Sequence, residues 1–157
     1  MLVGLPGSGK STWVASQGTT PVSSDEVRRL IADDAGIQTI HRLVFATVRH
    51  LVRQRIAAGC AFTYIDATNL TQRERRQYVK LAGLCGCDIE AVFFDVPLEA
   101  CMERNRGRSR VVPEDAMREM SRRLVPPSLA EGFNKITVPP YGGAPAPQPA
   151  PRPASPS

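Results

Sequence analysis

The first residues of the chain form a glycine-rich segment whose spacing suits the binding of a phosphate group. Residues 4–11 read Gly-Leu-Pro-Gly-Ser-Gly-Lys-Ser and fit the pattern G-x-x-x-x-G-K-[ST], between an apolar run and a predicted helix. Gly4, Gly7 and Gly9 allow successive backbone N–H groups to curl around a phosphate, and the helix N-terminus adds partial positive charge. Because a chance match in a chain of this length has odds of about one in two hundred, we predict a nucleotide-binding loop rather than a glycine turn that only caps a helix.

Four side chains in and after this loop complete the predicted nucleotide site. Lys10 places a point charge where β- and γ-phosphate oxygens would lie, and Ser11 offers its hydroxyl to Mg²⁺. Ser8 and Thr12 stand beside them and belong to the same predicted binding set. The loop therefore predicts a nucleotide and a magnesium ion as ligands.

A second segment with chemical potential follows the second predicted strand. It reads Ser-Ser-Asp-Glu-Val-Arg over residues 23–28. Asp25 and Arg28, three apart at a helix start, share one face, where the carboxylate could take a proton from a hydroxyl and the arginine could hold an anionic group. The same residues also suit a helix start, since Ser23 with Glu26 makes a capping box and an acidic residue there favours the helix dipole. Both interpretations can hold together.

Four arginines crowd the seven residues 104–110, between two predicted helices. Arg104 and Arg108 are four apart and are expected to share a helical face. We predict that Arg104, Arg108 and Arg110 belong to a lid that closes over the nucleotide, where guanidinium groups stabilise charge on a transferred phosphoryl group. The alternative is a solvated basic turn.

Apolar runs and helical patterns alternate along the chain. We expect strands at residues 1–5, 20–24, 61–66, 89–96 and 135–138, and helices at residues 10–16, 25–32, 38–58, 71–84, 98–105 and 113–124. Such alternation is typical of a parallel sheet covered by helices on both faces, an α/β architecture of the P-loop NTPase type. Ligands in such sheets bind at the carboxyl ends of the strands.

The composition is that of one ordinary domain followed by a tail. The 157 residues are 42% hydrophobic and 22% charged. We assign residues 1–140 to the domain and residues 141–157 to a disordered or polyproline-like tail, which could be a ligand for a proline-binding module. The net charge is +5, and all but three of the 20 basic residues are arginines, which favours an anionic substrate.

Other classes of protein are disfavoured. No apolar run approaches the roughly 20 residues of a membrane span, and Pro6 and Lys10 interrupt any signal-peptide pattern, so we expect a cytoplasmic protein with no membrane partner. The cysteines form no C-x-x-C pair and are expected to be small buried hydrophobes rather than metal ligands. They are Cys60, Cys85, Cys87 and Cys101.

Taken together, the motifs resemble a known family. The glycine loop, the segment 23–28, the Asp-Ala-Thr-Asn run at 66–69 and the arginine lid look like the 5′-hydroxyl polynucleotide kinase module of bacterial and phage RNA-repair enzymes, over residues 1–138. Zeta-toxin-like kinases of nucleotide sugars and kinases of small hydroxyl metabolites share the same outline. The resemblance implies ATP and Mg²⁺ as cofactors and a 5′-hydroxyl nucleic acid, RNA or DNA, as substrate. A separate phosphatase or repair protein is the implied partner.

The resemblance also implies a role for each motif residue. Lys10 and Ser11 would bind ATP and Mg²⁺, Asp25 would be the general base on the 5′-hydroxyl, and Arg28 would contact a substrate phosphate. Asp66 would act near the site, as a further magnesium ligand, unless it only caps the turn after its strand.

In the lid, Arg104 would bind the ATP phosphates, supported by Arg108 and Arg110.

Three functions stay open at this point. The leading one is a polynucleotide kinase. The others are a small-metabolite or nucleotide-sugar kinase and a catalytically silent nucleotide-binding module that docks through its tail.

Overall fold

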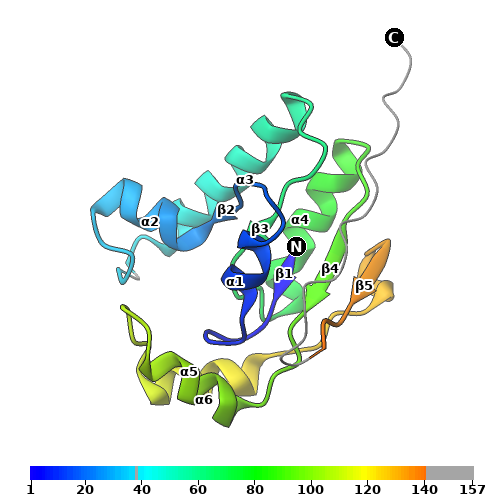
Figure 1. Ribbon diagram of the computed structural model, residues 1–157. Helices are drawn as coiled ribbons and strands as arrows, with labels where there is room; N and C mark the ends of the chain where they lie inside the picture. Colours follow the sequence, from blue (N-terminus) through cyan, green and yellow to red (C-terminus); the bar gives the residue numbers. More distant parts are fainter. Residues whose placement is uncertain (38, 141–157) are drawn as a thin grey trace.

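A computed structural model of the chain describes residues 1–37 and 39–140 and shows an α/β fold (Figure 1). The strands are β1 (Leu2–Val3), β2 (Val22–Ser23), β3 (Ile65–Asp66), β4 (Glu90–Phe93) and β5 (Lys135–Thr137). The helices are α1 (Lys10–Ala15), α2 (Ser24–Ala32), α3 (His41–Ala57), α4 (Gln72–Leu84), α5 (Leu98–Arg106) and α6 (Glu114–Arg123), with a 3₁₀ turn η1 (Leu129–Glu131) before β5.

All strand pairs are parallel. One sheet has the order β1-β4-β5 and the other pairs β2 with β3. Two hydrogen bonds join the ends of β1 and β3: the Gly4 N–H donates to the Thr68 carbonyl (3.0 Å), and the Asn69 amide donates to the Leu2 carbonyl (2.7 Å). The two sheets therefore continue one another, and the carboxyl ends of β1, β2 and β3 lie along one edge.

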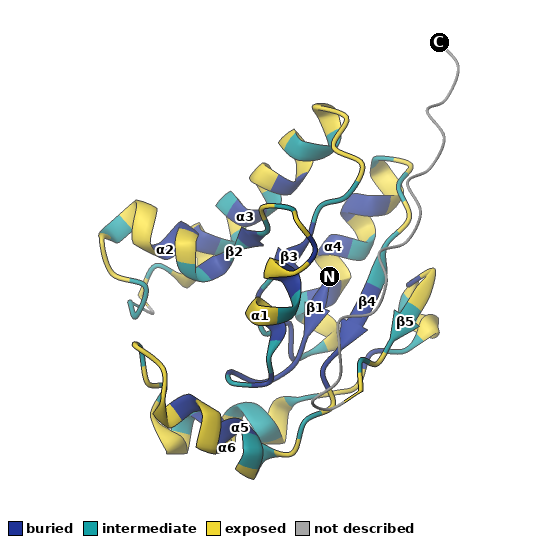
Figure 2. Ribbon diagram, viewed as in Figure 1, coloured by how far each residue is buried: buried dark blue, intermediate teal, exposed yellow. Residues whose placement is uncertain are grey.

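The core lies on both faces of this layer. Val3 and Phe93 point to the face covered by α3 and α4, whereas Leu2 and Val92 point to the opposite face, where Val14 of α1 packs. This division follows from the period-2 geometry of strands, in which successive side chains alternate between faces. Figure 2 shows the buried residues concentrated on β1, β4 and the inner sides of the helices.

Each predicted helix is present, within a few residues of its expected bounds, because the signals that start it are local. The capping box of α4 is complete: the Glu74 N–H donates to Thr71 Oγ1 (3.2 Å), and the Thr71 N–H donates to Glu74 Oε2 (3.1 Å). The helix predicted over residues 38–58 begins at His41 instead.

The strands are shorter than predicted. Of residues 61–66 only Ile65 and Asp66 are strand, because β2, the partner of β3, spans just Val22–Ser23. Of residues 89–96 only Glu90–Phe93 are strand. A strand needs a neighbour over its whole length, and an apolar run alone does not provide one.

The cysteine prediction holds in part. Cys101 is buried and Cys85 and Cys87 are partly buried, but Cys60 is exposed, since it follows Gly59 in the turn after α3. All four are free thiols, and within residues 1–37 and 39–140 no group of His, Cys, Asp or Glu side chains could hold a metal ion by itself. No helix in the described part of the chain is long and apolar enough to cross a membrane. The tail predicted over residues 141–157 falls outside the described residues.

Candidate functional site

A cleft of about 1220 Å³ opens at the carboxyl ends of β1, β2 and β3. Its walls come from the glycine loop, α2, the start of α3, the segment after β3 and the loop after α5. The cleft brings together nearly all the predicted site residues, which are Gly7, Ser8, Gly9, Lys10, Ser11, Thr12, Asp25, Arg28, Asp66, Arg104, Arg108 and Arg110. Gly4 alone of the predicted set does not line it, but its carbonyl accepts a hydrogen bond from Lys10.

The glycine loop has the backbone geometry that phosphate binding requires. Gly7 and Gly9 have φ of +80° and +96°, in the left-handed region that favours glycine, and a Cβ on Gly7 would collide with the carbonyl of Cys101. Gly9 is the N-cap of α1 and no side chain caps this helix. The N–H groups of the first turn of α1, from Lys10 onward, therefore have no intrahelical acceptor and can bind an anion.

The ammonium group of Lys10 lies buried beneath this loop. Its Nζ donates to the carbonyls of Gly4 (2.8 Å) and Leu5 (2.6 Å) and to the Ser8 hydroxyl (3.3 Å). Burial lowers the pKa of Lys10 to about 8, and the nearby Asp66 carboxylate partly opposes that shift. A bound phosphate would favour the charged form, so this cation is arranged to pair with an anion that enters the loop.

Ser11 and Asp66 meet at the base of the cleft. The Ser11 hydroxyl donates to Asp66 Oδ2 over 2.9 Å, although the two residues come from α1 and β3. Burial raises the pKa of Asp66, while the Ser11 hydrogen bond and Lys10 lower it. A hydroxyl beside a carboxylate, next to a phosphate loop, is the oxygen donor set that Mg²⁺ prefers, so these residues fit the ion.

Asp25 and Arg28 occupy the opposite wall, in the first turns of α2. Asp25 Oδ1 accepts from Arg28 Nη1 (3.1 Å) and lies 3.2 Å from Arg110 Nη1 of the lid. Arg28 is 6% exposed and its guanidinium lies 5.8 Å from the ring centre of Phe45. The Asp25 side chain lines the cleft and is 44% exposed, so the carboxylate is held in place and still accessible.

The capping interpretation of the same segment is partly correct. The Glu26 N–H donates to Ser23 Oγ over 3.4 Å, so Ser23 is the N-cap of α2. Glu26 binds Arg29 through both carboxylate oxygens (2.6 and 2.8 Å) instead of completing the box. Asp25 is therefore left to face the cleft while its neighbour stabilises the helix.

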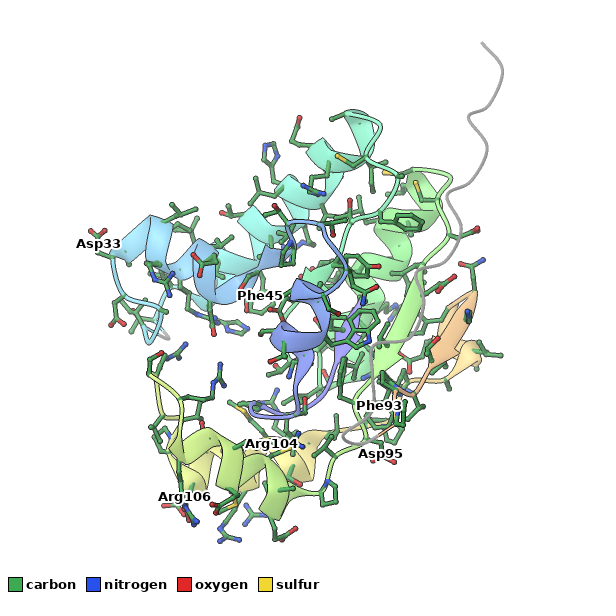
Figure 3. All side chains as sticks on the ribbon, viewed as in Figure 1. Asp33, Phe45, Phe93, Asp95, Arg104 and Arg106 are labelled. Carbon is green, nitrogen blue, oxygen red and sulfur yellow. The ribbon has the colours of Figure 1, made fainter. Side chains whose placement is uncertain are left out.

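The arginine segment surrounds the third side of the cleft, with one difference from prediction. Arg104 and Arg108 do not share a helical face, because α5 ends at Arg106 with Gly107 as its C-cap, and the Arg108 N–H bonds the Asn105 carbonyl in the turn that follows. Both still line the cleft, as does Arg110. Arg106 instead points outward and pairs with Glu103 and Glu114 (2.9 Å each); Figure 3 shows Arg104 toward the glycine loop and Arg106 on the far side.

Sequence reasoning missed Asn105, which closes the loop that contains Arg108 and Arg110. Asn105 is 1% exposed; its amide donates to the Val112 carbonyl (2.8 Å), and its Oδ1 accepts from the Val112 N–H (3.1 Å). The pair ties the two ends of the loop together. The sequence did contain a signal for this role. An asparagine near the end of a helix often forms hydrogen bonds to nearby backbone groups through its side-chain amide.

Arg75 and His41 were also missed. Arg75 is fully buried, pairs with Glu131 (2.7 Å) and donates to the carbonyls of Asn69 and Leu70, which fixes the turn after β3 beneath the cleft. His41 lines the cleft next to Phe45, with ring centres 4.6 Å apart, and its pKa is lowered by partial burial and by Arg28. Glu131 lies 56 positions from Arg75, so no local pattern marks that pair. His41 and Phe45 are four apart on α3, and this helical spacing was the available signal for His41.

Comparison with known proteins places this geometry in a family. Residues 1–127 match the sequence model of a family described as an AAA domain. The fold resembles the crystal structure of a gluconokinase from Sinorhizobium meliloti 1021, with a TM-score of 0.57 and 16% identity, over 87% of this chain and 78% of that chain. No curated protein is significantly similar in sequence. At that identity the structural likeness shows a common fold, but the family match covers well over half of the residues, so the protein belongs to this family of AAA domains.

Proposed function

We propose that the protein is a P-loop kinase that transfers the γ-phosphoryl group of ATP to a hydroxyl acceptor, the 5′-hydroxyl of a polynucleotide. One observation carries this proposal. A single cleft holds Lys10 on one wall and Asp25 on the other, and the lid reaches across to Asp25 through Arg110. A kinase requires this arrangement, since nucleotide and acceptor must meet in one enclosed site. The family and the shared fold support a kinase-type enzyme in general.

The residues on the nucleotide side fit ATP with Mg²⁺. ATP supplies the transferable γ-phosphoryl group, and the ion neutralises charge on its phosphates. In the chain itself, Lys10 and the N–H groups of the glycine loop would hold the phosphates, and Ser11 with Asp66 would hold the ion. Arg104 and Arg108 would add positive charge where negative charge develops during transfer.

On the acceptor side, Asp25 would take the proton from the attacking hydroxyl. The acceptor oxygen forms a bond to the γ-phosphorus while the bond from that phosphorus to the bridging oxygen breaks. The products are a phosphorylated acceptor and ADP, and the proton passes from Asp25 to solvent. Arg28, buried against Phe45 and bonded to Asp25, would hold the carboxylate in position and bind the first phosphate of the acceptor strand.

Charge and size favour a polynucleotide acceptor. The chain carries a net charge of +5. The cleft, at about 1220 Å³, exceeds the roughly 300–1,000 Å³ of typical small-ligand pockets. It can therefore hold an acceptor beside a nucleotide. The motif pattern described above also resembles polynucleotide kinase modules.

A small hydroxyl metabolite is the second candidate acceptor. The likeness to a protein named as a gluconokinase favours it. Such an enzyme would use the same Lys10 and Asp25 but would phosphorylate no polynucleotide, and salt would affect acceptor binding little. A third outcome, tight ATP binding without turnover on any acceptor, would indicate a silent nucleotide-binding module.

The test is transfer of label from γ-labelled ATP with Mg²⁺ to a 5′-hydroxyl RNA oligonucleotide. The native protein should label the oligonucleotide, and Asp25→Asn should lose at least about 100-fold of the rate with unchanged ATP affinity. Asp115→Asn, an exposed carboxylate in the first turn of α6, is the matched control and should keep full activity. ATP binding without labelling would refute the polynucleotide acceptor, and a screen of small hydroxyl metabolites would then decide between the remaining functions.

A further inference from the structure

A second hollow, of about 360 Å³, lies between α3 and α4, and we call it the α3–α4 groove. Helix α3 contributes Arg49, His50 and Arg53 to its lining, and α4 contributes Gln77 and Lys80. No residue discussed in the proposed reaction lines this groove. Its function is therefore a separate question.

The groove is strongly basic, and its cations lack acidic partners. None of its lining residues is Asp or Glu, and α3 contains no acidic residue over its 17 positions. Within residues 1–37 and 39–140, Arg49, Arg53 and Lys80 take part in no ion pair. Arginines on other surfaces do pair with glutamates, as Arg29, Arg106, Arg122 and Arg123 each show. Uncompensated cations along a groove attract a polyanion.

The groove continues the cleft along the same two helices. On α3, His41 and Phe45 line the cleft, and Arg49, four residues after Phe45 on the same side of the helix, lines the groove. On α4, Glu74 lines the cleft and Gln77, one turn later, lines the groove. Figure 1 shows α3 and α4 running in the same general direction. A strand held in the cleft on the Asp25 side can therefore leave it along the groove.

The junction between cleft and groove has the chemistry of single-strand binding. His41 is exposed and packs on Phe45, with ring centres 4.6 Å apart, and Arg28 lies over the Phe45 ring. The carboxylate at this point, Glu74, pairs with Arg123 (3.0 Å) and accepts a hydrogen bond from the Thr71 N–H. Aromatic rings that stack on bases, next to a row of cations that bind phosphates, are how proteins hold single-stranded nucleic acid.

We propose that the α3–α4 groove binds the single-stranded part of a nucleic-acid acceptor, whose terminal base stacks at His41 and Phe45 and whose following phosphates bind Arg49, Arg53 and Lys80. The proposal rests on the polynucleotide function above. From His41 to Arg53 the helix rises about 18 Å at about 1.5 Å per residue. At roughly 3.4 Å per stacked nucleotide, that span fits about five nucleotides.

The test compares two triple variants of the full chain that remove equal charge. The groove variant is Arg49→Ala/Arg53→Ala/Lys80→Ala, and the control is Arg118→Ala/Arg122→Ala/Lys135→Ala, on exposed parts of α6 and β5. Binding of 5′-hydroxyl RNA of two to twelve nucleotides is followed by fluorescence anisotropy, and labelling is followed in parallel. If Arg49→Ala destabilises the fold, Arg53→Ala/Lys80→Ala replaces the triple change, because both residues are exposed.

In the native protein and the control, affinity should rise with length up to about five nucleotides and then level off. The groove variant should bind long RNA at least about tenfold more weakly and a dinucleotide equally well, with unchanged affinity for ATP. Its log–log salt dependence should be shallower by about 2, since each lost phosphate contact on a single strand removes about 0.7.

The groove proposal is wrong if the groove variant binds long RNA as well as the control does, if native affinity is independent of length, or if an acidic peptide competes better than RNA. The proposed function fails differently. Length-dependent binding that the groove variant loses, without any labelling of the RNA, would support the groove and refute the kinase acceptor. Labelling of the RNA with an affinity that does not depend on RNA length would support the kinase function and refute the groove proposal.

Discussion

The burial that positions the Lys10 side chain for phosphate binding also disfavours its charged form. Its ammonium group is buried among two carbonyls and the Ser8 hydroxyl, and burial lowers its pKa to about 8. The free protein therefore begins to lose this proton just above neutral pH. A triphosphate in the loop would favour the protonated form and raise the pKa again.

The first prediction follows from that difference. Where the bound state holds more protons than the free state, affinity falls as pH rises. ATP should bind about tenfold more weakly at pH 9 than at pH 7, since the free Lys10 is mostly neutral one unit above a pKa of about 8. Isothermal titration calorimetry in two buffers of different ionisation enthalpy should show proton uptake at pH 8.5.

Lys10→Arg is the control for this prediction, because a guanidinium stays charged over the whole range. Its ATP affinity should be flat between pH 7 and 9. If the variant binds ATP too weakly to measure, proton uptake by the native protein decides the matter. If ATP binding at pH 8.5 takes up no proton, Lys10 is not the group whose protonation is coupled to ATP binding.

Asp66 gives the second prediction. Burial raises its pKa, so between the unfolded and folded pKa values the folded state binds more protons and stability falls as pH rises. The ionised carboxylate thus destabilises the metal-free fold at pH 7. Asp66→Asn should leave the thermal midpoint equal or higher without ligand, yet weaken Mg²⁺ binding to the ATP complex at least tenfold or so. Differential scanning fluorimetry across a Mg²⁺ titration with constant ATP measures both effects.

Asp95→Asn serves as the matched control for Asp66. It also follows a parallel strand, β4, but it is exposed and does not line the cleft. It should change neither the midpoint nor the response to Mg²⁺. Equal Mg²⁺ dependence in Asp66→Asn and Asp95→Asn would show that Asp66 is not a ligand.

At the residue scale, sequence spacing predicted the residues whose partners are close in the chain. Lys10, Ser11 and the Asp25/Arg28 pair follow from motifs of eight residues or fewer, because a loop or one helical turn places them. The Ser11–Asp66 hydrogen bond and the Arg28–Phe45 contact join segments far apart in sequence. Such contacts depend on the order of strands in the sheet, which no local pattern contains.

Among the elements, the lid shows what a local pattern can and cannot supply. Arg104, Arg108 and Arg110 were predicted to belong to the lid, and all three line the cleft. The helical face assigned to Arg104 and Arg108 was wrong because Gly107 ends α5 between them. Strand lengths were overestimated for a related reason. An apolar run indicates that a segment can form a strand, but the strand extends only as far as its hydrogen-bonded neighbour does.

The lid gives the third prediction, through Asn105. Asn105→Ala removes two hydrogen bonds that tie residues 105 and 112 together. A bond of this kind contributes about 1 kcal/mol, so the loop should open more often while the rest of the fold stays intact. Trypsin should cleave after the lid arginines at least about fivefold faster, the KM for ATP should rise, and the thermal midpoint should fall by roughly 4–8 °C.

Arg106→Ala provides the comparison, since Arg106 belongs to the same segment but faces outward and pairs with Glu103 and Glu114. Its KM for ATP should match that of the native protein. Saturating ATP should restore protection from trypsin in Asn105→Ala. Unchanged proteolysis of the lid in that variant would mean that Asn105 does not hold it.

For the whole molecule, the end of the domain is where the family match and the fold disagree. The match stops at residue 127, yet the following residues are integral to the structure. Phe133 is 4% exposed in the main core, β5 pairs with β4, and Glu131 neutralises the fully buried Arg75. A strand near residues 135–138 was predicted, but the Arg75–Glu131 pair was not, because the two residues lie 56 positions apart.

The fourth prediction concerns where the chain can be shortened. A chain ending at residue 140 should unfold cooperatively at nearly the native midpoint, because the core, β5 and Glu131 are all kept. A chain ending at residue 127 should fail to fold, since it loses a strand of the sheet and leaves the charge of Arg75 buried without a partner. An unpaired buried charge costs about 3–5 kcal/mol, a large share of the roughly 5–15 kcal/mol that stabilises a domain. Circular dichroism during heating distinguishes the two chains. A 127-residue chain that is stable and unfolds cooperatively would show that the domain folds without β5 and Glu131.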